Sequence, residues 1–144
     1  MTTFFRLVVF RLQPITKTAA YADVAAPTAE LMDWPTWDVI IDGTYVDAGD
    51  AETGYHHDGS APFAWTFGAH EMAFILEGNS TLVADDKVTF GPDMYIEAGD
   101  LVSFPAGWTG MWTVHTYMKK RFAFFDAQGV RTFPPRAAAY VHVS

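Results

Sequence analysis

Short runs of β-forming residues alternate with turn residues from residue 62 to near the end of the chain. β-Branched and aromatic residues favour strands, whereas clusters of Gly, Pro and Asp interrupt them. The clearest turn signals are Asp85-Asp86 and Gly91-Pro92-Asp93. Many short strands at this spacing predict an antiparallel β-sandwich or barrel. The expected strands span residues 63–68, 72–77, 79–84, 87–90, 94–96, 101–105, 111–116, 120–125 and 139–143.

The first sixty residues carry a less regular pattern. An apolar run rich in β-formers predicts a strand near the N-terminus, and a stretch of helical propensity is interrupted by Pro27 and ends at Trp34-Pro35. Asp42-Gly43 is a turn signal between two strand candidates. The expected elements are a strand at 4–12, a short helix starting at Thr28, two short strands within 37–46 and a polar loop at 47–59.

Composition narrows the class of protein and of partner. The chain has 144 residues, enough for one domain with a substantial core. It has no cysteine, which excludes disulfides, a thiolate nucleophile and sulfur ligands for a metal. The net charge of −8 argues against nucleic acids and anionic membranes, because both are themselves negatively charged.

The apolar N-terminal run is interpreted as a strand and not as a signal peptide. Arg6 and Arg11 interrupt it, and no small-residue cleavage site follows directly. No stretch of the sequence approaches the roughly 18 apolar residues that a membrane span needs. We therefore expect a cytoplasmic protein.

Two motifs in the second half of the chain resemble those of the cupin superfamily of small β-barrels. The superfamily motifs read G-x5-H-x-H-x3,4-E-x6-G and G-x5-P-x-G-x2-H. Glu71 and Gly78 match the end of the first motif, and residues 99–107 (GDLVSFPAG) match the second. Every histidine is missing, because the corresponding positions fall among residues 64–67 and at Gly110.

The resemblance implies an all-β fold, a single cupin barrel of the jelly-roll or double-stranded β-helix type. Residues 51–144 would form the barrel, and residues 1–50 an N-terminal extension of strands and one short helix, together one structural domain. The surrounding residues resemble a subfamily of small stand-alone cupins that includes ureidoglycine aminohydrolase-like and ethanolamine-utilisation-like proteins. The segments that carry this second resemblance are 63–78 and 105–122.

Glu71 is the candidate catalytic residue. In metal-binding cupins the first-motif ligands point into the barrel, and residues two apart on a strand share a face. Glu71 would then face an aromatic interior together with Trp65, Phe67 and Trp112. Such a carboxylate resists ionisation, so it could act as a general acid or base, or anchor a ligand. A structural glutamate bonded to the backbone or to Lys120 is the alternative.

The candidate ligand-binding residues are four aromatic residues and one lysine. The aromatic rings could stack a flat or cationic ligand, or they could simply form the core. Lys120, at the position of a subfamily lysine, could pair with Glu71 or hold an anionic group. Alternatively, it covers apolar surface and keeps its amine in water. The candidates are Trp65, Phe67, Trp108, Trp112 and Lys120, and Gly110 leaves room that tryptophans can fill.

The histidines do not replace the missing metal ligands in any obvious way. We expect His56 and His57 to diverge in a loop, His70 to face away from Glu71, and His115 to face opposite Val114. A rearranged site that joins His56 or His57 to Glu71 stays open, because three such ligands can hold zinc or iron. We expect no metal and no cofactor.

Two classes of function remain open. The first is a small-molecule binding protein with an aromatic, metal-free pocket anchored by Glu71. The second is an enzyme acting on a small nitrogenous metabolite, amidohydrolase- or isomerase-like, with Glu71 as general acid or base. A second polar group facing Glu71 would favour the enzyme, and Lys120, Thr66 and Thr109 are the candidates. We also expect a homodimer in which residues 4–12 contact the partner, since an exposed strand of this kind promotes aggregation.

Overall fold

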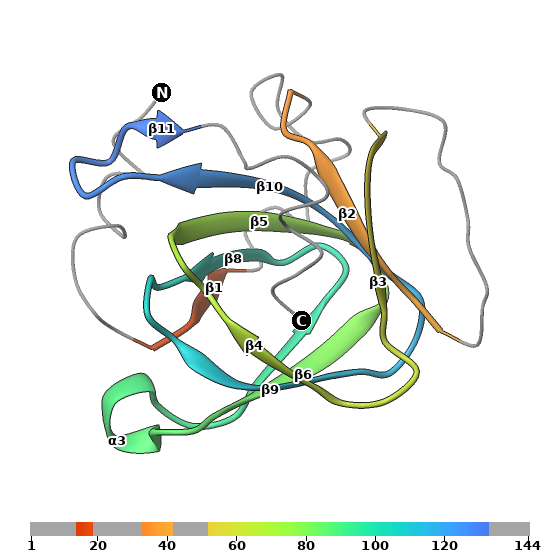
Figure 1. Cartoon of the computed structure of the whole chain (residues 1–144), viewed down its shortest axis with the longest axis horizontal. Coiled ribbons are helices and arrows are strands. Elements are labelled where there is room, and N and C mark those ends of the chain that lie inside the picture. Colours follow the sequence, from red (N-terminus) through yellow and green to blue (C-terminus); the bar gives the residue numbers. More distant parts are fainter. Residues whose placement is uncertain (1–13, 19–32, 42–51, 133–144) are drawn as a thin grey trace.

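The computed structural model describes residues 14–18, 33–41 and 52–132, and these form two β-sheets (Figure 1). Runs of β-forming residues produce short strands separated by turns, as the sequence predicts. The elements are β1 (Thr16–Thr18), β2 (Thr36–Ile40), β3 (Glu52–Asp58), β4 (Phe63–Thr66), β5 (His70–Glu77), β6 (Asn79–Ala84), α3 (Lys87–Phe90), β7 (Met94–Glu97), β8 (Leu101–Phe104), β9 (Thr109–Val114), β10 (Met118–Phe125) and β11 (Arg131–Thr132).

The larger sheet has seven strands, in the order β1-β8-β5-β10-β2-β3 with β11 added beside β10, and the smaller has the order β4-β9-β6-β7. Figure 1 shows β5, β8 and β10 side by side in one layer. The described strand pairs are antiparallel except β2–β3, which is parallel. The fold is of the expected all-β jelly-roll type. The two sheets pack as a sandwich and do not close into a barrel.

The main core lies between the two sheets. Strands of the smaller sheet alternate buried and more exposed residues, so one face of each packs inward. The central strand β10 is buried along its whole length. Its inward residues Phe122 and Phe124 join the main core, whereas Ala123 and Phe125 join a second buried cluster on the opposite face of the sheet. Burial of both faces explains why β10 reads as a nearly continuous apolar run after its cationic segment.

Two predicted elements are wrong. Residues 87–90 form the short helix α3 instead of a strand, because Asp86 caps it by accepting from the backbone N–H groups of Val88 and Thr89. The loop expected at 47–59 contains β3, whose polar residues pair in parallel with β2. The expected strands at 4–12 and 139–143 and the helix from Thr28 lie outside the described residues.

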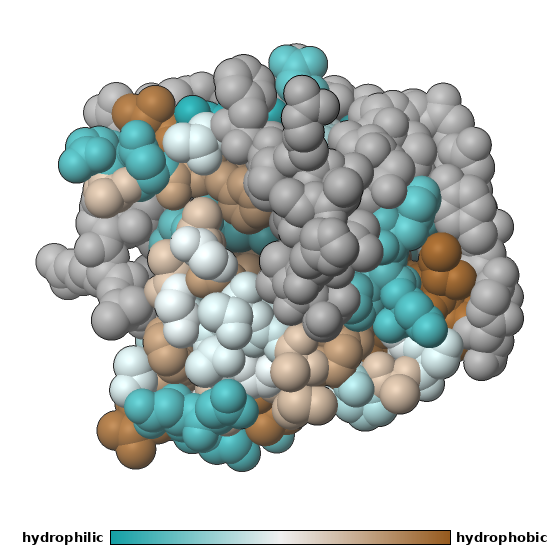
Figure 2. All heavy atoms as spheres, viewed as in Figure 1, coloured by the Kyte–Doolittle hydropathy of each residue, from teal (hydrophilic) through white to brown (hydrophobic). Residues whose placement is uncertain are grey.

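Hydrophobic residues on the described surface are scattered. Figure 2 shows hydrophilic and intermediate residues interspersed with small hydrophobic groups on the viewed face. The described part of the chain contains no helix with the length and hydrophobicity needed to cross a membrane. The large hydrophobic residues that are exposed are Val88, Tyr95, Met111 and Val130.

Candidate functional site

Glu71 lies on the inner face of the larger sheet. It is on β5, where it pairs with Phe104 of β8 on one side and with Phe124 of β10 on the other. Its side chain is buried, with 1% of its surface exposed. Strand alternation places Glu71 on the same face as Ala73 and Ile75, which belong to the main core.

Lys120 also points inward and is the ionic partner of Glu71. Its Nζ donates a hydrogen bond to Oε2 of Glu71, and the lysine itself has 0% exposure. On β10, Lys120 is opposite Trp37 of β2 and Ile75 of β5, next to a register shift between Lys119 and Lys120. The structure thereby answers the question of direction that the sequence left open for Lys120.

Aromatic rings surround the Lys120 ammonium. The ring centroid of Trp37 is 4.6 Å from Nζ, those of Phe104 and Trp112 are 5.1 Å away, and that of Phe122 is 5.6 Å away. These distances lie within the range at which the negative face of an aromatic ring attracts a cation. The rings and the Glu71 carboxylate together replace the water that a lysine ammonium normally binds.

Burial and ion pairing shift the pKa values of Glu71 and Lys120 in opposite directions. Burial raises the pKa of Glu71, and the nearby ammonium partly counteracts this. Burial lowers the pKa of Lys120, and the carboxylate partly counteracts that. The neutral acid–amine form is therefore closer in free energy to the ion pair than it would be in water.

The predicted aromatic site residues are all buried in the same core. The rings of Trp65 and Trp112 lie 5.8 Å apart between centroids, and Phe67 stacks on Phe104 at 4.4 Å. Trp108 meets Phe67 edge-on at 5.8 Å. Trp65, Phe67, Trp108 and Trp112 therefore pack against one another around the side of the interior that also holds Glu71.

The four histidines within the described residues take four different positions. His56 and His57 lie on β3 instead of in a loop, yet they diverge as expected, because neighbours on a strand face opposite sides. His70 faces away from Glu71 and lies 3.0 Å from the hydroxyl of Ser103. His115 lies 2.9 Å from the hydroxyl of Thr81. Among the described residues, no three His, Cys, Asp or Glu side chains are grouped closely enough to hold a metal ion.

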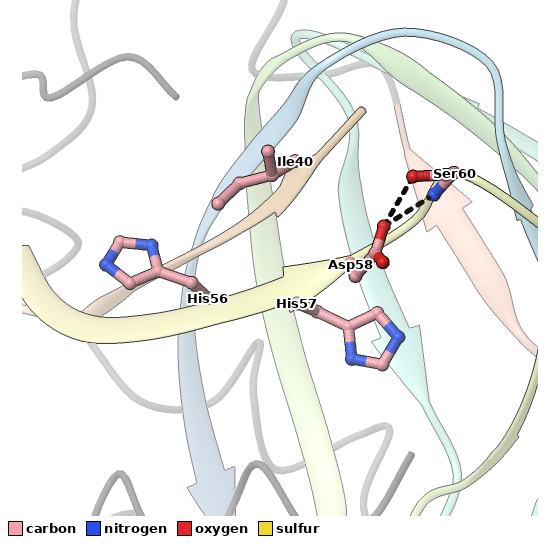
Figure 3. A pocket seen from close by; sticks show the side chains of 5 residues that line it. All are labelled: Ile40, His56, His57, Asp58 and Ser60. Carbon is pink, nitrogen blue, oxygen red and sulfur yellow. Dashed lines mark hydrogen bonds between the residues drawn. The ribbon is translucent and has the colours of Figure 1, made fainter. Parts of the chain in front are cut away.

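A pocket of about 310 Å³ lies beside β3, away from the Glu71–Lys120 pair. Figure 3 shows His56 and His57 extending from the strand in different directions, and Asp58 bonded to Ser60. The His57 ring is 4.0 Å from that of Phe63 and 5.7 Å from that of Trp65, so it lies between the pocket and the aromatic core. The pocket is lined by Ile40, His56, His57, Asp58 and Ser60.

One polar residue, bonded to His56 of this pocket, was missed by the sequence analysis. Asp38 accepts hydrogen bonds from His56 and Tyr117, and it is buried. The signal for Asp38 was its place between Trp37 and Val39, where a charged residue interrupts an apolar strand. Its link to His56 could not be anticipated, because it depends on the parallel pairing of β2 with β3.

Sequence comparison supports the expectation raised by the two motifs. Residues 47–122, over half of the chain, match the family of EutQ-like cupin domains. The chain belongs to the EutQ-like cupin family. None of the curated proteins matches this cupin closely.

Solved structures agree with the cupin fold. A DUF861 family protein from Thermotoga maritima is 24% identical, with a TM-score of 0.52 over 77% of this chain and 99% of that one. The EutQ protein of Clostridium difficile is 21% identical, with a TM-score of 0.39 over 46% of this cupin and 49% of that protein. At 24% identity, the likeness to the Thermotoga maritima protein concerns the fold alone.

The residues at the motif positions of this cupin do not fit a transition metal. The buried side chains of Trp65 and Phe67 carry no lone pair for a metal, and the Glu71 carboxylate already binds the Lys120 ammonium. Gly110, at the second-motif histidine, has no free space: a Cβ there would lie 2.1 Å from the carbonyl oxygen of Val83 and 2.7 Å from Cη2 of Trp108. The space beside Gly110 is therefore occupied by the Val83 backbone and by Trp108, one of the flanking tryptophans expected to fill it.

Proposed function

We propose that this cupin binds a small metabolite in an aromatic, metal-free site whose polar anchor is Glu71 paired with Lys120. The observation that carries the proposal is the fully buried ion pair inside a wall of aromatic rings. The narrower assignment to stand-alone cupins of the ureidoglycine aminohydrolase-like and ethanolamine-utilisation-like group, without metal-binding histidines, is part of the same proposal.

The pair is better explained by ligand recognition than by stability. Removing two charges from water costs several kcal/mol per ion, and apolar replacements of buried pairs are often neutral or stabilising. An ammonium also has three N–H donors. Among the described side chains, Glu71 is the only hydrogen-bond acceptor of Lys120. A ligand with a carbonyl or carboxylate oxygen would satisfy a further donor, while its apolar part packs against the tryptophans.

The pocket beside β3 offers the route to this anchor. His57 separates the pocket from the interior, and its ring lies 6.0 Å from that of Trp37. Trp37 in turn lies over the Lys120 ammonium. A ligand would reach the pair by displacing the His57 and Trp37 rings, which is a rearrangement of side chains and not of the sheet.

Thermal-shift screening of a small-metabolite library against the wild-type protein and Glu71→Gln tests the proposal. We expect compounds that raise the melting temperature of the wild type and quench tryptophan fluorescence, with both effects lost in Glu71→Gln. Thr66→Val, which changes an exposed residue, is the control and should keep both effects. Compounds that stabilise Glu71→Gln as strongly as the wild type, or a library without any stabilising compound, would contradict it.

The enzyme hypothesis has one specific observation in its favour. Lys120 is the second polar group facing Glu71, and acid–base chemistry usually needs such a partner. With the pKa of Glu71 raised and that of Lys120 lowered by burial, one group could give a proton to a substrate while the other takes one. Mass spectrometry of each stabilising compound after incubation decides between the two: conversion by the wild type but not by Glu71→Gln makes the protein an enzyme.

A further inference from the structure

The amine of Lys120 combines three properties that suit a nucleophile. It is buried, with 0% of the residue exposed, it contacts a carboxylate, and aromatic rings surround it. Removal from water is one way in which proteins activate a lysine for attack on a carbonyl carbon. Burial lowers the pKa of Lys120, against the partial effect of the Glu71 carboxylate, and so favours the neutral amine that this attack requires.

The other three lysines of the chain lack this combination. Lys119 is also buried, but it lies on the opposite face of β10, and its Nζ has no hydrogen-bond partner in the described part of the chain. Lys17 donates to a backbone carbonyl oxygen at the surface. The side chain of Lys87 is 57% exposed and pairs with Asp93. These three lysines are therefore internal controls for a reaction assigned to Lys120.

We propose that Lys120 forms a covalent imine with a small uncharged aldehyde or ketone, and that Glu71 accepts and returns the proton in this reaction. The inference rests on the proposed ligand site and names the class of its ligand. A carbonyl compound with its own carboxylate is disfavoured, because that charge would share the interior with the Glu71 carboxylate. The other buried lysine and arginine of the described residues, Lys119 and Arg121, lie on the opposite face of β10 from Lys120.

The reaction conserves atoms and charge. The Lys120 ammonium gives one proton to the Glu71 carboxylate, and the neutral amine attacks the carbonyl carbon. A carbon–nitrogen bond forms, and the former carbonyl oxygen takes a proton from the nitrogen, which gives a carbinolamine. Glu71 then returns its proton to the carbinolamine hydroxyl, which leaves as water while the carbon–nitrogen double bond forms.

The surroundings of Lys120 suit the product as well as the starting ammonium. The iminium nitrogen carries the same single positive charge as the ammonium. The Glu71 carboxylate and the rings of Trp37 and Trp112 therefore still face a cation after the ligand has bound. The core gains no uncompensated charge, and the alkyl part of the ligand packs against the aromatic rings.

Reductive trapping of the full chain with propanal and sodium cyanoborohydride at pH 7 tests the proposal. Cyanoborohydride reduces the iminium to a stable N-propyl lysine, which peptide mass spectrometry assigns to one residue. We expect the labelling rate of Lys120 to saturate as the propanal concentration rises, whereas that of Lys87 should rise in proportion to it. Lys119 should stay unlabelled. Pyruvate, which carries a carboxylate, should give no saturable labelling of Lys120.

The variant Glu71→Gln tests the proton transfer. It should lower the saturated labelling rate of Lys120 by about 100-fold, the lower end of what a general acid contributes, and leave the rate of Lys87 unchanged. Glu97→Gln, the same substitution at an exposed glutamate, is the matched control and should label like the wild type. Circular dichroism confirms that each variant is folded, and the mapping of the wild type decides on the imine without either variant.

The outcomes separate the imine from the ligand site on which it rests. Labelling of Lys120 that is absent, that does not saturate, or that pyruvate reproduces would overturn the imine. An unchanged saturated rate in Glu71→Gln would overturn the role of Glu71 in it. The ligand site would still be upheld by compounds without an aldehyde or ketone group that stabilise the wild type but not Glu71→Gln.

Discussion

A carboxylate and an ammonium that lose their water together stay charged only while they remain in contact. For Glu71 and Lys120 this contact is supported by the rings of Trp37, Phe104 and Trp112, whose faces attract the cation. Removing either partner leaves the other charge, or an unsatisfied polar group, in the core. The chemistry of the site therefore depends on both residues and not on Glu71 alone.

Single and double substitutions of this pair should be strongly non-additive. Glu71→Gln and Lys120→Met should each lower the free energy of unfolding by about 3–5 kcal/mol, because each leaves one buried group uncompensated. The double variant should cost less than the sum of the two by about 1–3 kcal/mol. Urea unfolding measures all three, and additive losses would show that the two side chains do not interact.

His70 should make the protein sensitive to moderate acid. Burial lowers its pKa to about 4 from 6.5. Below pH 6.5 the unfolded chain binds a proton at His70 that the folded chain does not, so the free energy of unfolding should fall as the pH drops from about 6.5 to about 4, by about 3 kcal/mol. Above pH 6.5 this residue should have no effect.

Unfolding measurements on His70→Gln test this residue directly, since Gln can keep a hydrogen bond to Ser103. The variant should lose less stability than the wild type between pH 6.5 and pH 4, and the His70 ring should titrate near pH 4 by NMR. Titration of His70 near 6.5 would contradict the effect of burial.

For single residues, the sequence predicted the direction of a side chain better than the residues that the side chain contacts. Strand alternation and the motif resemblance were enough to place Glu71 inward and to point His70 away from it. The direction of Lys120 depends on a register shift beside it, and no local pattern reports such a shift. The contact of Asp38 with His56 joins residues from two strands whose pairing was not foreseen.

The turns that connect the strands restrict most strictly which residue type can occupy a position. Gly107, in the Pro-x-Gly turn before β9, has φ +89°, and Gly78, between β5 and β6, has φ +81°. Side chains other than glycine rarely adopt this conformation. At Gly78 an added Cβ would also lie 2.1 Å from the carbonyl oxygen of Tyr117.

A graded series of alanine substitutions should follow these constraints. Gly107→Ala should cost about 1 kcal/mol or more, because alanine is strained at this positive φ. Gly78→Ala should cost more, because the backbone must also move. Gly68→Ala, at a position with no positive φ and nothing within 4 Å of the added Cβ, is the control. Thermal unfolding ranks the three, and an equal effect at all positions would contradict the turn assignments.

The elements that the sequence predicted well are those with strong internal patterns. Residues 79–84 form β6 with the predicted bounds, because alternation and flanking turns coincide there. The sequence predicts a loop where β3 lies, because the polar residues of β3 follow no apolar alternation; parallel pairing with β2 holds them in the sheet. The sequence predicts a strand where α3 lies, because its four residues include β-formers; the Asp86 cap makes them helical.

The two-sheet architecture follows from the motif resemblance and from the composition. A chain with 16% aromatic residues can fill a sandwich interior with rings and leaves the larger sheet buried on both faces at β10. The resemblance could not predict the chemistry of the interior, because that chemistry depends on the residues that depart from the superfamily motifs.

The predicted homodimer concerns residues 4–12, outside the described residues. Their apolar character in an acidic chain is the reason to expect that they contact a partner. Light scattering should show a dimer for the full chain, and monomer or aggregate after deletion of residues 1–12. A dimer that survives the deletion would refute this role.

Elemental analysis of the purified protein tests the central claim most directly. We propose that the Lys120 ammonium, and not a metal ion, is the cation bound to Glu71 inside the aromatic core. Purified without added metal, the protein should contain no stoichiometric zinc, iron or manganese, and Glu71→Gln should not change the result. About one metal ion per chain, lost in Glu71→Gln, would contradict the metal-free site and favour a metal-dependent enzyme.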